Sequence, residues 1–257
     1  GSPRSHLHVV RGSGHRCHRC EGGPHLAAQA SPEGDGVDQA AQVADGLGYE
    51  VAYGVAARAG GGEYGNAVLS KFPILATDTL PLPSPPTEEG RSLLHVDVRA
   101  PWGRTPFFVT HLHWKPEHGS VRVEQARAVV DAVNVRAPSD SGGFPALLAG
   151  DFNADADADE IQLIREGRDA RGPARPFVDC FVAANGQLPG HTFARSNRYA
   201  AKECDRNQRI DYVFVREIRP AAPGFPLAAR VVCTVPGGGV FPSDHYGVYV
   251  ELRAAPL

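Results

Sequence analysis

Hydrophobic and polar positions change their spacing several times along the chain, and these changes predict a succession of strands and helices. Short stretches that alternate between apolar and polar residues, or that are apolar throughout, predict β-strands, because successive side chains of a strand point to opposite faces. The strands expected on this basis cover residues 49–53, 64–70, 93–98, 107–109, 146–149, 210–215, 230–235 and 246–252.

Apolar residues recur at helical spacing in three other segments. In residues 37–47 and 121–135 they fall three or four positions apart, which places them on one face of a helix. Residues 159–165 predict a shorter helix, and Gly48 is suited to end the first one. Residues 81–86 predict a proline-rich loop. Strands joined by short turns and interrupted by a few helices indicate an α/β or α+β fold with mixed sheets.

One predicted strand ends in a group of polar residues. Residues 147–153 have the sequence Leu-Leu-Ala-Gly-Asp-Phe-Asn, and Gly150 permits a close backbone approach that a Cβ atom would resist. Asp151 and Asn153 lie on either side of Phe152, so in extended backbone their side chains face the same way. A carboxylate and an amide together suit a hard cation and a phosphate ester. The structural alternative is a simple turn that follows the strand.

Three further stretches place titratable side chains at or beside predicted strand ends. Taken singly, each has a structural explanation, such as a hydrogen-bonded histidine or a solvated turn. Asp211 is different because its neighbours are apolar, and a carboxylate there is costly unless it pairs with a cation, a histidine or a metal. Arg209 is the structural alternative for such a partner. The three stretches are 110–112 (Thr-His-Leu), 209–212 (Arg-Ile-Asp-Tyr) and 243–245 (Ser-Asp-His).

Composition narrows the class of protein. With 257 residues and 42% hydrophobic content, the chain can bury the core of one large domain. A net charge of −3 gives no overall attraction for a polyanion, so any such contact requires a local patch. Five cysteines form no disulfide framework, which favours a reducing compartment, and we expect a cytoplasmic monomer. No apolar run approaches the roughly 18 residues that a membrane span needs.

Residues 1–36 differ in composition from the rest of the chain. They contain five of the eleven histidines and lack Phe, Tyr, Trp and Ile, so they offer little to a hydrophobic core. We expect this segment to be disordered or non-native, and we expect the folded domain to cover residues 37–257. Cys17 and Cys20, with histidines beside them, suggest a zinc site, although a single Cys-x-x-Cys pair is a weak signal.

Taken together and in this order, the four polar stretches resemble the motifs of the endonuclease/exonuclease/phosphatase superfamily. Residues 64–74 are similar to a further landmark of that family, and the resemblance covers about residues 37–252. The family includes pancreatic deoxyribonuclease, abasic-site endonucleases, sphingomyelinases and inositol-polyphosphate phosphatases. The resemblance implies a four-layered α/β sandwich of two mixed β-sheets flanked by helices. It also implies metal-dependent hydrolysis of a phosphate ester by in-line attack of water.

The resemblance assigns roles to residues at the strand ends. Asp151 would orient or deprotonate the attacking water, and Asn153 would hold a phosphate oxygen or the shell of a metal ion. Asp244 would be a metal ligand. The implied cofactor is Mg²⁺ or Mn²⁺, since Mg²⁺ takes few carboxylates and keeps several waters.

The remaining implied roles concern contact with phosphate. His245 would contact the scissile phosphate, with its tautomer set by Asp211. His111 would stabilise charge on the phosphate or on the leaving group. Asn66 and Arg91 are further candidates for phosphate binding, Arg91 through its planar guanidinium.

The amino-terminal part departs from the family pattern. Members of the family begin with a strand that bears an Asn and continue, after a helix, to a strand that ends in Gln-Glu, whose Glu binds the metal. Upstream of Asp38 this sequence has neither, and Glu21 and Glu33 do not follow an apolar strand. We therefore expect that two core strands are missing and that metal affinity and stability are reduced.

The favoured activity is that of a nuclease-like phosphodiesterase, with a phosphate ester such as nucleic acid as its substrate. The sequence has no strong basic stripe for duplex nucleic acid, which leaves the substrate open. The alternatives are a phosphomonoesterase or sphingomyelinase-type activity, or a family member whose catalysis is impaired because the metal-binding Glu is missing.

Overall fold

The computed structural model describes residues 4–9, 38–59, 62–138, 143–168, 174–216 and 218–254. Within the unusual amino-terminal segment, strand β1 covers Arg4–Val9. In the described ranges, no helix is both long and apolar enough to cross a membrane. The domain boundary at residue 36 stays a prediction. So do the roles of the candidate metal ligands that lie outside the described residues, which are Cys17, Cys20, Glu21 and Glu33.

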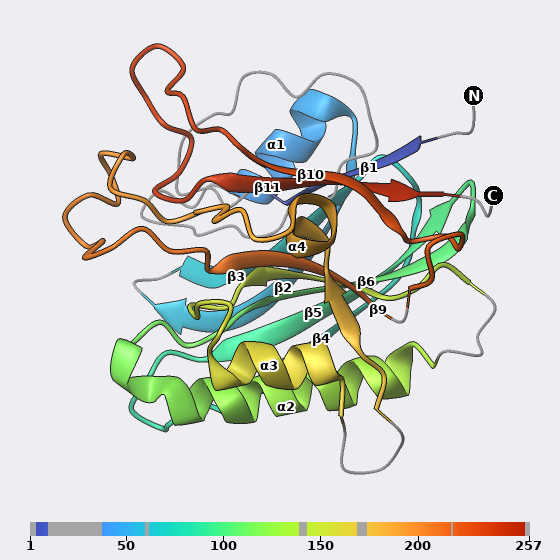
Figure 1. The fold of residues 1–257 in the computed structure, drawn as a ribbon, viewed down its shortest axis with the longest axis horizontal. Helices are drawn as coiled ribbons and strands as arrows, with labels where there is room; N and C mark the ends of the chain where they lie inside the picture. Colours follow the sequence, from blue (N-terminus) through green and yellow to red (C-terminus); the bar gives the residue numbers. More distant parts are fainter. Residues whose placement is uncertain are drawn as a thin grey trace.

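The largest sheet has six strands, which follow each other in space differently from their order in the chain (Figure 1). They are β4 (Ile74–Leu82), β5 (Arg91–Ala100), β6 (Gly103–His111), β7 (Leu147–Asp151), β8 (Phe177–Asp179) and β9 (Asp211–Arg216). Across the sheet the order is β4-β5-β6-β7-β9-β8. β6 and β7 run parallel, whereas the other neighbours are antiparallel, so the sheet is mixed.

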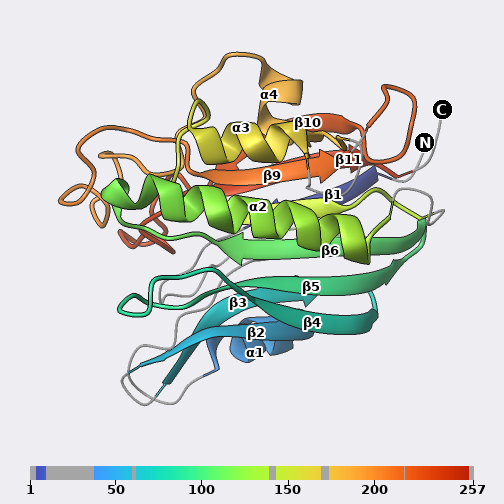
Figure 2. The same cartoon turned by 90° about the horizontal axis from the view of Figure 1, so that it is seen from below.

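Two helices cover one face of this sheet, α2 (Gly119–Arg136) and α3 (Asp159–Glu166) (Figure 2). A short 3-10 turn, η1 (Pro116–His118), leads into α2, which forms part of the crossover that the parallel strands β6 and β7 require. Side chains alternate between the two faces of the sheet. Phe108 and Leu148 pack toward the helices, whereas Phe107 and Leu147 pack in the core on the other side.

The opposite layer contains two groups of strands in the described part of the chain. β2 (Glu50–Ala59) pairs with β3 (Gly62–Ser70), and β11 (Gly247–Arg253) lies between β1 and β10 (Pro226–Val232). All these described pairings are antiparallel.

Two more helices complete the architecture. α1 (Gln39–Leu47) packs Ala40 and Ala44 against Ala67 and Leu69 of β3, while Val68 points to the core between the strand layers. α4 (Cys180–Asn185) directly follows β8 and contacts β10. The layers therefore run from α2 and α3 through the six-stranded sheet and the smaller strand groups to α1. The predicted α/β sandwich is confirmed.

The structure corrects two predicted boundaries. The proline-rich loop expected at residues 81–86 is wrong at its start, because Pro81 and Leu82 end β4. β4 lacks the apolar alternation that predicts a strand, since most of its side chains are at least partly exposed. Among the strands of the described ranges it pairs with β5 alone, at the edge of the sheet, where a residue without an N–H donor is tolerated. Similarly, β10 begins at Pro226 and ends at Val232, earlier than the strand expected at 230–235.

Candidate active site

Three predicted site residues lie in one row across the six-stranded sheet. His111 of β6 is opposite Asp151 of β7, and Asp151 is opposite Asp211 of β9. Directly opposed residues on neighbouring strands carry their side chains on the same face of a sheet. All three residues are buried, and Nε2 of His111 lies 3.3 Å from Oδ2 of Asp151. The pairing register of the strands therefore brings these side chains together.

His245 joins the row from the segment that precedes β11. Its Nδ1 lies 2.8 Å from Oδ2 of Asp211, and its ring packs at a tilt against Phe193 with the centroids 4.7 Å apart. A carboxylate only accepts hydrogen bonds, so Nδ1 carries the proton and Nε2 is the basic nitrogen of the neutral ring. The alternative partner for Asp211 is occupied elsewhere, because Arg209 pairs with Asp179 at 2.7 Å.

Thr192 holds the backbone around Asp211. Its hydroxyl oxygen accepts hydrogen bonds from the backbone N–H groups of Ile210 and Asp211, both at 3.2 Å. Thr192 and Phe193 were not predicted as part of the site. They are 18 or more positions from Asp211 in the sequence, and nothing in their local pattern indicates this contact.

The ring of His111 is fixed from its other side. Nη1 of Arg91 lies 3.2 Å from Nδ1 of His111 and 3.3 Å from the hydroxyl of Tyr64, which itself contacts the same Nδ1. A guanidinium only donates hydrogen bonds, so Nδ1 of His111 accepts and Nε2 carries the proton. The proton on Nε2 then faces the carboxylate of Asp151. His111 and His245 are therefore held in opposite tautomers.

The backbone at the end of β7 and just after it differs from the extended form that the sequence predicts. Gly150 has φ of +146°, and a Cβ atom there would lie 1.8 Å from the carbonyl oxygen of Thr110, so only glycine fits. Asn153 has φ of +49°, a left-handed conformation that Asn tolerates. The predicted alternation of Asp151 and Asn153 along an extended strand is therefore wrong, because β7 ends at Asp151.

Asn153 nevertheless stays beside Asp151. Its backbone N–H donates to Oδ1 of Asp151 at 2.9 Å, and its side-chain Nδ2 donates to the carbonyl oxygen of Leu112 at 3.0 Å. Tyr212 braces the same region, since its hydroxyl oxygen lies 2.8 Å from the carbonyl oxygen of Ala154 and 2.7 Å from that of Arg209, and its single proton can be donated to either. Burial raises the pKa of Tyr212, which keeps this donor protonated.

Two other predicted residues have clear structural contacts. Asn66 is buried, and its Nδ2 donates to the carbonyl oxygen of Ser92 at 3.0 Å, which links β3 to β5. The Asp244 carboxylate accepts a hydrogen bond from the Ser243 hydroxyl at 3.1 Å. Nδ2 of Asn197 donates to the carbonyl oxygens of both Ser243 and Asp244 and so holds this turn. The roles of Asn66 in phosphate binding and of Asp244 in metal binding stay predictions.

Asp151, Asp211 and His245 form a group that has the residue types of a metal site. Each offers one ligand atom, these atoms all lie within 4.8 Å of one another, and all three residues are buried. Carboxylate oxygens suit the hard cations Mg²⁺ and Mn²⁺, so the donor set fits a divalent cation. We call these three residues the sheet group. Asp244, which the resemblance implies as a ligand, is not a member of it.

Comparisons with known proteins agree with this architecture. Residues 24–245 match the model of the Endonuclease/Exonuclease/phosphatase family. Truncated TDP2 from Caenorhabditis elegans is 18% identical, with a TM-score of 0.66 over 90% of this chain and 84% of that one. D. rerio TDP2 complexed with single strand DNA product is 20% identical, with a TM-score of 0.64 over 89% of this chain and 85% of that one.

A third solved structure has the same fold. The human Nocturnin catalytic domain with bound sulfate anion is 15% identical, with a TM-score of 0.63 over 88% of this chain and 80% of that one. No curated protein matches the chain. At these identities the solved structures show the fold, and the family match extends over most of the chain. This chain belongs to the Endonuclease/Exonuclease/phosphatase family.

Proposed function

We propose that the protein hydrolyses a phosphate ester with the help of Mg²⁺ or Mn²⁺, and that it acts as a nuclease-like phosphodiesterase. The observation that carries this proposal is the row formed by His111, Asp151 and Asp211, with His245 bonded to its end. The row combines two carboxylates with two imidazoles whose protons lie on different nitrogens. Such a set can accept a proton from water and can also bind a phosphate oxygen.

Asp151 is the group that orients the attacking water and takes its proton. Its carboxylate is held by the N–H of Asn153 on Oδ1 and faces Nε2 of His111 on Oδ2. Asp151, as a member of the sheet group, would hold the divalent cation, together with Asn153 and Asp244, the further ligands that the resemblance implies. When bound, the cation supplies charge stabilisation at a phosphoryl oxygen and lowers the pKa of water.

The two histidines contact the phosphate in different ways. Asp211 keeps the proton of His245 on Nδ1, so Nε2 faces the phosphate and forms a charged donor once the ring is protonated. His111 presents its Nε2 proton between Asp151 and the phosphate oxygen, while Arg91 behind it supplies a fixed positive charge. Both contacts strengthen as negative charge develops in the transition state.

Nucleic acid is the substrate class that we favour. The D. rerio TDP2 structure contains a single strand DNA product, and this chain is similar to it in fold. Two exposed aromatic side chains support the same choice. Trp114 follows the end of β6 and has Lys115 over its ring, and Tyr199 lies two residues from Asn197 with Arg198 over its ring. Exposed rings next to cationic side chains are suited to stacking with bases beside a phosphate backbone.

The test compares three substrates with the full chain after its metal has been removed with EDTA. Bis-p-nitrophenyl phosphate represents a diester, p-nitrophenyl phosphate a monoester, and a labelled oligonucleotide a nucleic acid. We expect hydrolysis of the diester and the oligonucleotide to return when Mg²⁺ or Mn²⁺ is added. Faster hydrolysis of the monoester would favour a phosphomonoesterase. No hydrolysis by a folded chain would favour the impaired family member.

A further inference from the structure

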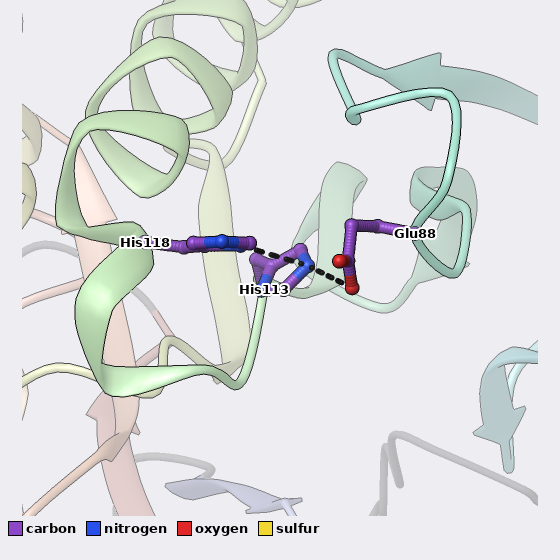
Figure 3. Close-up of side chains that lie close together, drawn as sticks. All are labelled: Glu88, His113 and His118. Atoms are coloured by element: carbon purple, nitrogen blue, oxygen red, sulfur yellow. Dashed lines mark hydrogen bonds and ion pairs between the residues drawn. The ribbon is translucent and has the colours of Figure 1, made fainter.

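A second set of metal-binding residue types lies in loops outside the sheet group. Glu88 comes from the connection between β4 and β5, His113 follows the end of β6, and His118 ends η1 (Figure 3). Each of the three offers one ligand atom, and these atoms all lie within 4.8 Å of one another. We call these residues the loop group. None of its members is predicted as a site residue from the sequence.

The two spacings that His113 makes match a tetrahedral ion site. Nε2 of His113 lies 3.4 Å from Oε2 of Glu88 and 3.4 Å from Nδ1 of His118. Dashed lines mark both contacts in Figure 3. In a tetrahedral zinc site with bonds of about 2.0–2.1 Å, two ligand atoms lie about 3.3–3.4 Å apart. Four residues separate the two histidines, inside the range of about three to five found in zinc motifs.

The surrounding structure holds these ligands in place. Gln125 of α2 is fully buried, and it bonds both loops. Its Oε1 accepts from the N–H of His113 at 2.9 Å, and its Nε2 donates to the carbonyl oxygen of Pro83 at 2.8 Å. Arg122, which is paired with Glu160, donates to the carbonyl oxygens of His113 and Lys115. The loops that carry the ligands are therefore clamped by buried side chains of one helix.

Lys115 orients the carboxylate of Glu88. Its Nζ lies 2.7 Å from Oε1, which leaves Oε2 on the side of the imidazoles. This hydrogen bond lowers the pKa of Glu88 and keeps the carboxylate ionised. The ammonium also repels a cation, and the N–H of Lys115 donates to Nδ1 of His113 at 3.3 Å. That long contact must open when Nε2 of His113 binds an ion, because Nδ1 then carries the proton.

We propose that Glu88, His113 and His118 bind a transition-metal dication, with Zn²⁺ as the favoured ion and water as the fourth ligand. Two imidazoles and one carboxylate are a donor set that suits Zn²⁺ better than Mg²⁺. Since His113 lies two residues after His111, the ion would fix the loop that leaves the end of β6. This proposal does not depend on the hydrolytic activity proposed above.

The test uses Co²⁺ as a spectroscopic probe, because tetrahedral Co²⁺ absorbs visible light strongly and Zn²⁺ displaces it. The full chain carries Cys17→Ser and Cys20→Ser, so that those thiols do not contribute. We expect one equivalent of Co²⁺ to give visible bands that Zn²⁺ removes. Glu88→Gln and His118→Gln should each weaken Zn²⁺ binding by about 100-fold or more. Replacing a residue that only hydrogen-bonds to a metal ligand already lowers metal affinity by about 10–100-fold.

Two control variants make the assignment specific. Glu117→Gln changes an exposed carboxylate in the same turn as His118 and should leave the bands intact. Asp151→Asn changes the sheet group and should also leave them intact. Near-ultraviolet circular dichroism confirms that each variant is folded. Absence of bands in the folded parent would overturn the proposal. Bands that remain in both the Glu88→Gln and the His118→Gln variant would also overturn it, and so would bands that disappear only in the Asp151→Asn variant.

Discussion

The sheet group and the loop group differ in what holds their side chains in place. Asp151 and Asp211 sit in neighbouring strands whose backbone hydrogen bonds fix their register. Glu88 and His113 sit in loops that depend on side-chain contacts from α2. A site built on strands depends on the integrity of the whole sheet, whereas a site built on loops depends on a few buried hydrogen bonds. The two groups should therefore respond to different substitutions.

The chemistry of the two groups differs in the same way. The sheet group has two carboxylates and one imidazole, all buried, whereas the loop group has one partly exposed carboxylate and two imidazoles. Hard oxygen ligands favour Mg²⁺ or Mn²⁺, and imidazoles favour Zn²⁺. If both proposals hold, ligand type alone would direct Mg²⁺ or Mn²⁺ to the sheet group and Zn²⁺ to the loop group. Four predictions test this separation, from the largest expected effect to the smallest.

Asp151→Asn should have the largest effect. It removes the proposed base and one ligand of the sheet group, and loss of a general base alone costs on the order of 10²–10⁴ in turnover. Hydrolysis of bis-p-nitrophenyl phosphate with saturating Mg²⁺ measures this loss. The matched control is Asp155→Asn, because Asp155 pairs with Arg206 at the surface side of the same loop. Equal activity of Asp151→Asn and Asp155→Asn would contradict the assignment.

Asp211→Asn should have the second largest effect. It keeps the shape of the side chain but removes the charge that fixes His245, and a comparable change in a catalytic triad costs about 10⁴ in turnover. We expect turnover to fall by about 10²-fold or more. The loss is smaller than in the triad because a bound cation carries part of the charge. KM should change less than turnover.

Asp179→Asn is the control for loss of a buried carboxylate. Asp179 pairs with Arg209 and caps α4, so its replacement should lower the free energy of unfolding without a specific loss of turnover. Turnover of Asp211→Asn within about twofold of the parent, in a folded protein, would mean that the carboxylate has only a structural role.

Gln125→Ala should have the third largest effect, and this effect should fall on the loop group. Removing this clamp should weaken Zn²⁺ binding by about 10–100-fold, as found for partners that orient ligands. The free energy of unfolding should fall by about 1–3 kcal/mol, because buried hydrogen-bond partners lose their contacts. Gln162→Ala is the control, because the half-buried Gln162 of α3 also donates to a backbone carbonyl oxygen, that of Ala156, but lies outside the loop group. Unchanged Zn²⁺ affinity, measured by competition with Co²⁺, would show that the loops keep their geometry without Gln125.

His95 should give the smallest effect, and it belongs to neither group. Its ring stacks on Phe108 with the centroids 4.5 Å apart. Burial lowers its pKa, against the opposing effect of Asp97, while Arg104 and Arg136 add to the lowering. The unfolded chain therefore binds this proton first as the pH falls below about 6.5. The contribution of His95 should therefore lower the free energy of unfolding as the pH falls below about 6.5, and it should have no effect at higher pH.

Chemical denaturation between pH 7.5 and 5.5 measures this dependence. The contribution of His95 to the pH dependence of the free energy of unfolding should disappear in the His95→Gln variant. This contribution should be the same with and without EDTA, because His95 belongs to neither group of candidate metal ligands. A slope that depends on EDTA instead would assign the pH dependence to the sheet group or the loop group.

The sequence predicts residues of this site where the signal is local. His111, Asp151 and Asp211 follow or begin apolar strands, and short motifs are enough to find them. Their arrangement in one row follows from strand register, which depends on pairings between distant segments. The turn at Asn153 could not be foreseen from alternation, because its left-handed conformation breaks the period of the strand.

Contacts between distant segments explain what the sequence does not predict. Tyr64 is 47 positions from His111, and Glu88 is 25 positions from His113, so neither pair forms a motif. β4 escaped prediction for a different reason. It is an exposed edge strand, and its order comes from hydrogen bonds to β5 rather than from a buried apolar face.

The position of Arg91 links the loop group to His111, which faces Asp151 of the sheet group. Its guanidinium is bonded to His111, and its charge also reaches the loop group, where burial and then the charges of His118 and Arg91 lower the pKa of His113. An anion that binds Arg91 screens this charge and therefore makes the loop group more attractive to a cation. By reciprocity, a cation in the loop group favours anion binding at Arg91 by the same factor. Phosphate and Zn²⁺ should accordingly bind with positive cooperativity, although each has its own ligands.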